Sequence, residues 1–166
     1  MIARIFRPIN IFTFFVGLLI IGGLFVLQNR TDTLITESER SPLSTIKVND
    51  VIINIELADT QEKRSRGLSG RVTLPESNGM LFLFGKSGFY SFWMKDMQFP
   101  LDIIWIDKNY RIADITKNIP PDSFPQAFQP REPVQYVLEV NAGFAEKNNI
   151  TIADAVDFSS VFYTLK

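Results

Sequence analysis

The stretch Ser91-Phe-Trp-Met-Lys95-Asp96-Met-Gln-Phe-Pro100-Leu-Asp102-Ile-Ile-Trp105-Ile-Asp107 is densely apolar and aromatic, yet it has charged residues inside it. Short apolar runs of this kind are typical of strands that are covered on both faces. Proline cannot donate to a strand ladder, so we expect a turn or bulge at Pro100, between two strands. Charged side chains are rarely buried without a partner, so Lys95, Asp96 and Asp102 need either a structural or a functional explanation.

Strand patterns recur on both sides of this stretch. Runs of β-branched, aromatic and other apolar residues predict short strands at 51–57, 80–84, 89–93, 102–107, 110–116, 134–140, 150–158 and 161–163, with a turn at 85–88. Thr60 and Gly67 predict the two ends of a helix at 61–66, and Asn141 predicts the start of another at 142–147. We therefore expect a mainly β (α+β) fold, a small antiparallel barrel or sandwich of about seven or eight short strands with two short helices.

The composition excludes several kinds of chemistry. The 166 residues include no histidine and no cysteine, which rules out Ser-His-Asp and Cys-His catalysis, thiol redox chemistry and disulfides. Zinc sites are built mainly from those residues, so any metal would be a hard cation held by oxygen atoms, and we expect no metal and no other cofactor. The formal net charge is −1 and there is no block of lysine and arginine, so we expect no nucleic-acid partner.

The N-terminus predicts a membrane anchor. Residues 9–27 (INIFTFFVGLLIIGGLFVL) carry no charge and would span about 28 Å as a helix, close to the thickness of the hydrocarbon core. Arg4 and Arg7 precede this run and only Arg30 follows closely, so the positive-inside rule places the N-terminus in the cytoplasm and the remainder outside. The alternative is a cleaved signal peptide and secretion, but the run is long and no small-residue cleavage site follows it.

The domain organisation follows from this anchor. We expect a short basic cytoplasmic segment at 1–8, one transmembrane helix or signal anchor at 9–27, a polar tether at 28–45 and a single domain at 46–166. A loop at 119–133 contains five prolines, which favour an ordered, extended path, and long loops in compact domains are often functional. Nothing in the sequence indicates an oligomeric state.

Six blocks of residues occur in a characteristic order and spacing: Glu56-Leu-Ala-Asp-Thr60, Arg66-Gly-Leu68, Gly79-Met-Leu-Phe82, Ser91-Phe-Trp-Met-Lys95, Pro100-Leu-Asp-Ile-Ile104 and Val137-Leu-Glu-Val-Asn-Ala-Gly143. Together they resemble the DUF192 family of uncharacterised bacterial and archaeal proteins, over about residues 51–158. The resemblance implies a compact, mainly β fold with small helices that is often exported or anchored. It implies no reaction.

The chain departs from the pattern of this family at four positions. Ser69 stands where the resemblance implies methionine, Asp96 where asparagine is frequent, Tyr110 where a turn glycine is common and Ala153 where glycine is usual. The second departure bears on function. A position that is commonly an amide is a poor candidate for an obligatory general acid or base.

The acids inside apolar strands are the main candidates for a site. If Asp96, Asp102 and Glu139 converge, paired carboxylates could support general acid–base chemistry or hold Ca²⁺ or Mg²⁺. Alternatively, Lys95 or a nearby arginine pairs with them and the charges are structural, which the lack of a recognised catalytic spacing favours. The candidate site rim comprises Arg66, Arg71, Lys95, Asp96, Asp102, Glu139 and Asn141.

Aromatic side chains offer a second kind of surface. Alternation places Phe89 and Trp93 on one face of a strand and Tyr90 and Phe92 on the other. Because both faces carry apolar bulk, we expect most of these rings in the core, with room for one tryptophan at a rim that contacts a ligand.

Three functions fit these observations. The leading one is a membrane-anchored, extracytoplasmic binding or accessory module, without enzymatic activity, for a cell-envelope glycan or an envelope protein. The first alternative is a carboxylate-dependent hydrolase or lyase using Asp102 and Glu139, which requires both side chains in one solvent-reachable cleft. The second is a purely structural envelope protein, which would have no cleft and an exposed apolar patch.

Overall fold

The computed structural model describes residues 44–164, and side chains up to Val161. The expected membrane span at 9–27, the basic segment at 1–8 and most of the tether lie outside the described residues. Over 44–164, no helix is both long enough and apolar enough to cross a membrane. The final two residues of the expected tether, Ser44 and Thr45, are already part of the first strand.

The described residues form nine strands, three α-helices and one 3-10 helix. In chain order these are β1 (Ser44–Val48), β2 (Val51–Ala58), α2 (Gln61–Arg66), β3 (Asn78–Gly88), β4 (Phe92–Trp93), β5 (Leu101–Ile106), β6 (Ile112–Ile119), η1 (Pro121–Ser123), β7 (Ala127–Phe128), β8 (Val134–Asn141), α3 (Phe144–Lys147), β9 (Val156–Asp157) and α4 (Ser159–Thr164). The mainly β expectation is confirmed.

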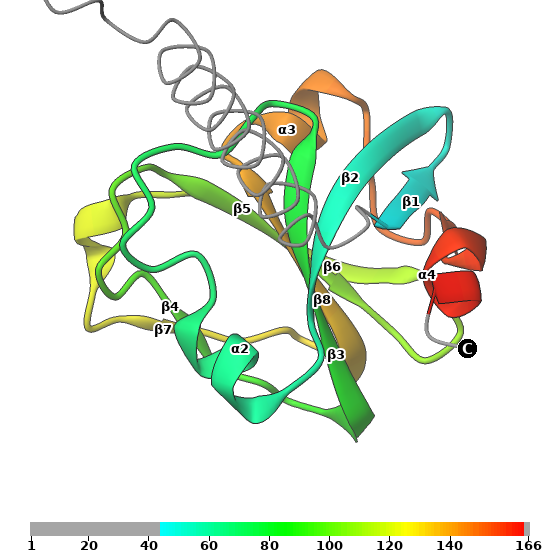
Figure 1. Cartoon of the computed structure of the whole chain (residues 1–166), viewed down its shortest axis with the longest axis horizontal. Coiled ribbons are helices and arrows are strands. Elements are labelled where there is room, and N and C mark those ends of the chain that lie inside the picture. The colour runs from blue at the N-terminus through cyan, green and yellow to red at the C-terminus, as the bar shows by residue number, and fades with distance from the viewer. Residues whose placement is uncertain (1–43, 165–166) are drawn as a thin grey trace, which may run out of the picture. The chain divides into compact units, whose positions relative to one another are not determined.

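Seven strands form one curled sheet in the order β6-β5-β8-β3-β2-β1-β9, and β4 pairs with β7 separately. The sheet curls into a half-barrel (Figure 1), and one isolated bridge, between Arg111 and Ala155, links the chain just before β6 to the chain just before β9. Of the two expected architectures, the barrel is closer than the sandwich. The pairing is antiparallel, as expected, except between β2 and β3, which are parallel. Parallel neighbours need a crossover, and α2 lies in it.

Several expected elements differ from those observed, and of the strand expected at 150–158 only Val156–Asp157 (β9) forms. Residues 161–163 are helical rather than extended, because Asp157 accepts hydrogen bonds from the backbone N–H and the hydroxyl of Ser159 and so starts α4. Residues 85–88 continue β3 instead of turning, so only the last two residues of 89–93 form a strand. The helix expected at 142–147 begins at Phe144, with Gly143 as its N-cap.

The two faces of the sheet bury two apolar clusters. Ile104, Leu138 and Phe144 belong to one cluster, here called the helix-side core, which also includes Val161 of α4. The other cluster, here called the pocket-side core, contains Phe82, Met94, Ile103, Trp105 and Val137. Successive residues of β5 alternate between the two, and all six of them are buried. Each strand of the sheet centre therefore contributes to both cores.

Candidate functional site

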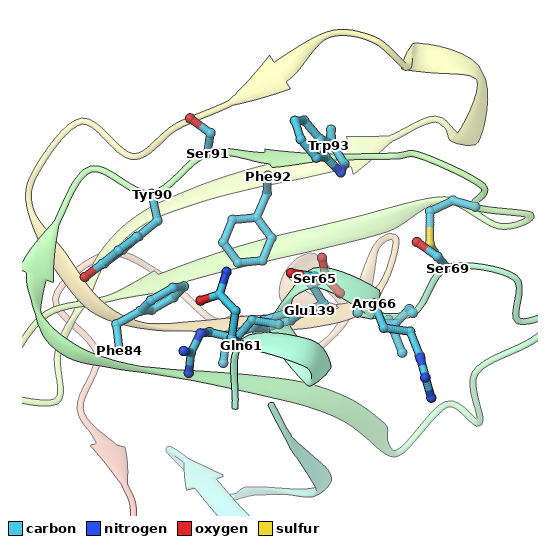
Figure 2. A pocket seen from close by; sticks show the side chains of 15 residues that line it. Gln61, Ser65, Arg66, Ser69, Phe84, Tyr90, Ser91, Phe92, Trp93 and Glu139 are labelled. Atoms are coloured by element: carbon cyan, nitrogen blue, oxygen red, sulfur yellow. The ribbon is translucent and has the colours of Figure 1, made fainter. Parts of the chain in front are cut away.

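A cavity of about 420 Å³ opens on the pocket-side face of the sheet, within the size range of small-molecule sites. One wall consists of α2 and the residues that follow it, and the other of aromatic side chains from β3 and β4 (Figure 2). Its lining residues are Gln61, Arg64, Ser65, Arg66, Gly67, Leu68, Ser69, Phe82, Phe84, Tyr90, Ser91, Phe92, Trp93, Met97 and Glu139.

The helical wall is positioned by its two caps, both of which the sequence predicts. The Thr60 hydroxyl accepts a hydrogen bond from the Lys63 backbone N–H, and Gly67 ends the helix at a φ of 53°. Arg64 ties this wall to β3: its guanidinium donates to the Leu83 carbonyl at 3.0 Å and lies 5.6 Å from the centre of the Phe84 ring. The helix buries none of its residues, so its side chains are available at the cavity mouth.

The aromatic wall is a chain of ring contacts. Phe84 stacks on Tyr90 with 3.6 Å between ring centroids, and Phe92 meets Phe82 edge to face at 4.8 Å. Trp93 stands at the mouth with 57% of its surface exposed, in edge-to-face contact with Phe124 of the proline-rich loop. An exposed tryptophan was allowed for in the expectation that these rings are mostly core, whereas Phe89, which is 59% exposed, departs from it.

Glu139 lies in the cavity lining and comes from β8, in the centre of the sheet. Its neighbours across the sheet are Met80 and Ile103, and only 5% of its surface is exposed. The Oε2 atom is buried without a hydrogen-bond partner among the described residues. Burial raises the pKa of this carboxyl to about 8, and the nearby positive charge of Arg71 only partly offsets the effect. At neutral pH Glu139 is therefore mainly a neutral acid.

Arg71 is close to this site but is already paired. Its guanidinium makes two hydrogen bonds to the Glu56 carboxylate, at 2.5 and 2.6 Å. These bonds hold the pKa of Glu56 below its usual value and join the end of the crossover to β2. Arg71 thus adds positive potential beside Glu139 without neutralising it.

Asp102 does not approach Glu139. In the sheet register Asp102 is opposite Val140, so its side chain leaves the other face of the sheet and enters the helix-side core. It is fully buried, and its carboxylate accepts hydrogen bonds from the backbone N–H groups of Asn118 (2.8 Å) and Ala145 (3.0 Å). The carboxylate is thus satisfied by backbone donors, and not by the lysine or arginine side chains considered above.

The remaining candidates hold the backbone in place. The carbonyl of Lys95 accepts a hydrogen bond from the Ser69 hydroxyl and that of Asp96 accepts one from the Gly70 N–H, both at 2.8 Å. These bonds join the loop after β4 to the chain after α2 and close one end of the cavity. The Asn141 side chain donates to the Leu74 carbonyl at 2.9 Å, so it anchors the crossover instead of capping a helix.

Three of the four departures from the family pattern share a backbone conformation. Asp96, Tyr110 and Ala153 have φ values of 56°, 60° and 73°, in the left-handed region that glycine and asparagine adopt most easily. A preference for glycine or asparagine at these positions therefore has a conformational cause. The choice between Asp and Asn at residue 96 concerns the backbone of an exposed turn, and the side chain is not part of the cavity lining.

Of the seven candidate residues, the structure brings only Arg66 and Glu139 into the cavity lining. Sequence reasoning missed the polar residues Gln61 and Ser65 as wall residues, because a helix with no apolar face gives no indication of what it covers. Among the described residues there is no group of three acidic side chains that could hold a metal ion. Chemically, the cavity offers aromatic faces, one protonated acid and arginine side chains at the mouth.

The chain is a small β domain whose half-barrel contains one parallel crossover. Comparison of its sequence with models of protein families identifies the family. The model of DUF192, described as an uncharacterized ACR, matches residues 44–158. The chain belongs to this family. No curated protein matches it.

Two crystal structures show the same fold. One is a protein from Sinorhizobium meliloti 1021 that is provisionally described as a transcription regulator. It is 31% identical, has a TM-score of 0.65, and the match covers 70% of this chain and 92% of that one. The other is a protein of unknown function from Novosphingobium aromaticivorans DSM 12444. It is 30% identical, has a TM-score of 0.64, and the match covers 72% of this chain and 89% of that one.

Proposed function

We propose that this chain is a membrane-tethered, extracytoplasmic binding module, and that the cavity between α2 and the aromatic wall takes its ligand. The unpaired Oε2 atom of Glu139 carries this proposal. A buried acceptor without a partner costs about 1–3 kcal/mol, and a bound donor would remove that cost. A cell-envelope glycan or a segment of an envelope protein is the target that suits a tethered domain.

The rival functions have less support. A hydrolase using Asp102 and Glu139 needs both carboxyls at one site, but they leave opposite faces of the sheet. A purely structural role gives no reason for an unpaired acid in a cavity. The description of the Sinorhizobium meliloti protein as a transcription regulator is not extended to this chain, whose formal net charge is −1 and which has no basic block.

Binding is tested by screening the full-length chain against envelope glycan fragments and peptides, with thermal shift as the readout. Glu139→Met, which removes the donor and the acceptor while keeping the side-chain length, tests the site, and Glu132→Met, a change at an exposed acid outside the cavity lining, is the matched control. We expect at least one compound to stabilise the parent and the control but not Glu139→Met. Stabilisation of all three proteins alike would show that the cavity is not the binding site.

The location is tested separately. Because the chain has no cysteine, a single Ser87→Cys change on the exposed end of β3 provides one thiol in the domain, and Arg4→Cys provides one in the expected cytoplasmic segment. In intact cells, a membrane-impermeant maleimide should label the first variant and not the second. Labelling of neither variant, or of the second alone, would contradict an extracytoplasmic domain.

A further inference from the structure

The charged side chains of the cavity lining are Arg64, Arg66 and Glu139. Burial keeps Glu139 mainly protonated at neutral pH, so the lining then carries two formal positive charges. Arg64 is held by backbone carbonyls and by the Phe84 ring. Arg66, by contrast, is exposed, and its guanidinium has no hydrogen-bond or ion-pair partner among the described residues. Figure 2 shows the Arg66 side chain extending away from the rings, and because it is exposed and unpartnered it can turn toward a negative charge at the mouth of the cavity.

Glu139, the acid in the lining, calls for a different ligand group from the negative charge that suits Arg66. A protonated carboxyl has one O–H donor and also accepts hydrogen bonds, and the buried Oε2 of Glu139 lacks a partner. A hydroxyl group is its natural complement, because it donates and accepts as well. A carboxylate or phosphate could accept a hydrogen bond from the protonated acid, but it has no proton to donate to the unpaired acceptor of Glu139 and is repelled by the ionised fraction of the acid.

The wall that faces α2 is aromatic, and several of its rings meet edge to face. Five rings line the cavity: Phe82, Phe84, Tyr90, Phe92 and Trp93. The exposed Trp93 and its partner Phe124 extend this aromatic surface beyond the mouth. Ring faces of this kind pack against the C–H face of a sugar ring as well as against other apolar surfaces.

On the basis of the proposed binding function, we infer that the ligand is an acidic sugar: a saccharide unit whose hydroxyl meets Glu139, whose ring packs on the aromatic wall and whose carboxylate meets Arg66 at the mouth. The positive lining disfavours an amino sugar with a free ammonium group. A neutral sugar would gain the first two contacts and lack the third.

A matched set of methyl glycosides tests this inference. Methyl glucuronide and methyl galacturonide carry the acid, methyl glucoside and methyl galactoside are their neutral counterparts, and methyl glucosaminide is cationic. The full-length chain is purified in a detergent without a sugar headgroup, and the indole N–H signals are followed by NMR during titration. The chain has two tryptophans, so Trp93 in the cavity is read separately from Trp105 in the core.

We expect one of the acidic glycosides to bind about 3–10-fold more tightly than its neutral counterpart, with the difference shrinking as salt is added. Arg66→Gln should abolish that difference, whereas Lys108→Gln, an exposed control outside the cavity lining, should preserve it. Glu139→Met, which can neither donate nor accept a hydrogen bond at this position, should weaken both sugars about tenfold.

The outcomes separate the class of ligand from the binding function. If the neutral or cationic glycoside binds as tightly as the acidic one, or if Arg66→Gln leaves the preference intact, the acidic-sugar inference is overturned while the binding function stands. If no glycoside shifts the Trp93 signal but a peptide in the broader screen does so through Glu139, the ligand is not a sugar. If Glu139→Met affects no ligand, the binding function itself fails.

Discussion

Glu139 should make the stability of the domain depend on pH in a range where most proteins titrate histidine. In the folded state burial raises the pKa of this carboxyl from 4.5 to about 8, whereas in the unfolded state it is expected near the ordinary value. The unfolded chain therefore releases the proton first as the pH rises. Stability should fall between about pH 4.5 and 8 and level off above that range.

The magnitude follows from the two pKa values. Each pKa unit corresponds to about 1.4 kcal/mol, so the complete titration lowers the free energy of unfolding by roughly 4–5 kcal/mol, of which about 2–3 kcal/mol is lost between about pH 5.5 and 7.5. For a domain of this size that loss corresponds to a decrease in Tm of roughly 10 °C. The chain has no histidine and no cysteine, so of the ordinary titrating groups only the terminal amine shares this range.

The assay is urea unfolding of the full-length chain, followed by tryptophan fluorescence at several pH values. Both tryptophans lie in the described domain, so the signal reports on the domain itself. Glu139→Gln removes the titrating group and should flatten the dependence, whatever its absolute stability, and Glu132→Gln should keep the slope of the parent. A parent curve that is flat between about pH 5.5 and 7.5 would refute the assignment of Glu139 as a buried, unpaired acid.

Three further predictions concern the framework. Asp102→Asn should lower the free energy of unfolding by about 1–3 kcal/mol, because an amide group cannot accept hydrogen bonds from both backbone N–H groups. The folded variant should keep any ligand affinity of the parent. A loss of affinity without a loss of stability would contradict the structural role. Gly79→Ala should lower the free energy of unfolding by at least about 2 kcal/mol, because the alanine Cβ would lie 2.8 Å from the backbone carbonyl oxygen of Glu139. In chemical denaturation, an unchanged midpoint would show that β3 and β8 can move apart to admit the methyl group. Ala153→Gly should raise the free energy of unfolding by about 0.5–1 kcal/mol, because alanine is strained at a φ of 73° and glycine is not. A lower free energy of unfolding would mean that the flexibility of glycine in the unfolded chain outweighs the relief of this strain.

Local chemistry made much of the fold predictable. The helix at 61–66 and both of its caps follow from Thr60 and Gly67, and most strands follow from short apolar runs. The parallel pairing of β2 with β3 could not be derived in the same way, because pairing partners are chosen by contacts between residues far apart in the chain. The two strands of the β4–β7 pair are also too short to leave a pattern.

The candidate site depends on register, which explains why it was only partly predictable. Asp102 and Glu139 both look like acids buried in apolar strands, and only a difference of one residue in pairing separates them. Asp102 is opposite Val140 and Ile103 is opposite Glu139, so the two carboxyls leave opposite faces of the sheet. Arg66 and Glu139 could be named as candidates from sequence, but the cavity that unites them requires the curl of the sheet.

The crossover between the two parallel strands has an evolutionary consequence. The lining acid comes from a central strand, where any change of register would unfold the sheet, whereas Arg64 and Arg66 come from residues between β2 and β3 that pair with no strand. Replacing residues 59–77 with those of a relative would exchange the charges at the mouth and keep the acid in place. Under the proposed binding function, selectivity within this family would diverge by exchange of one short segment, much as antibody loops diversify on a constant frame.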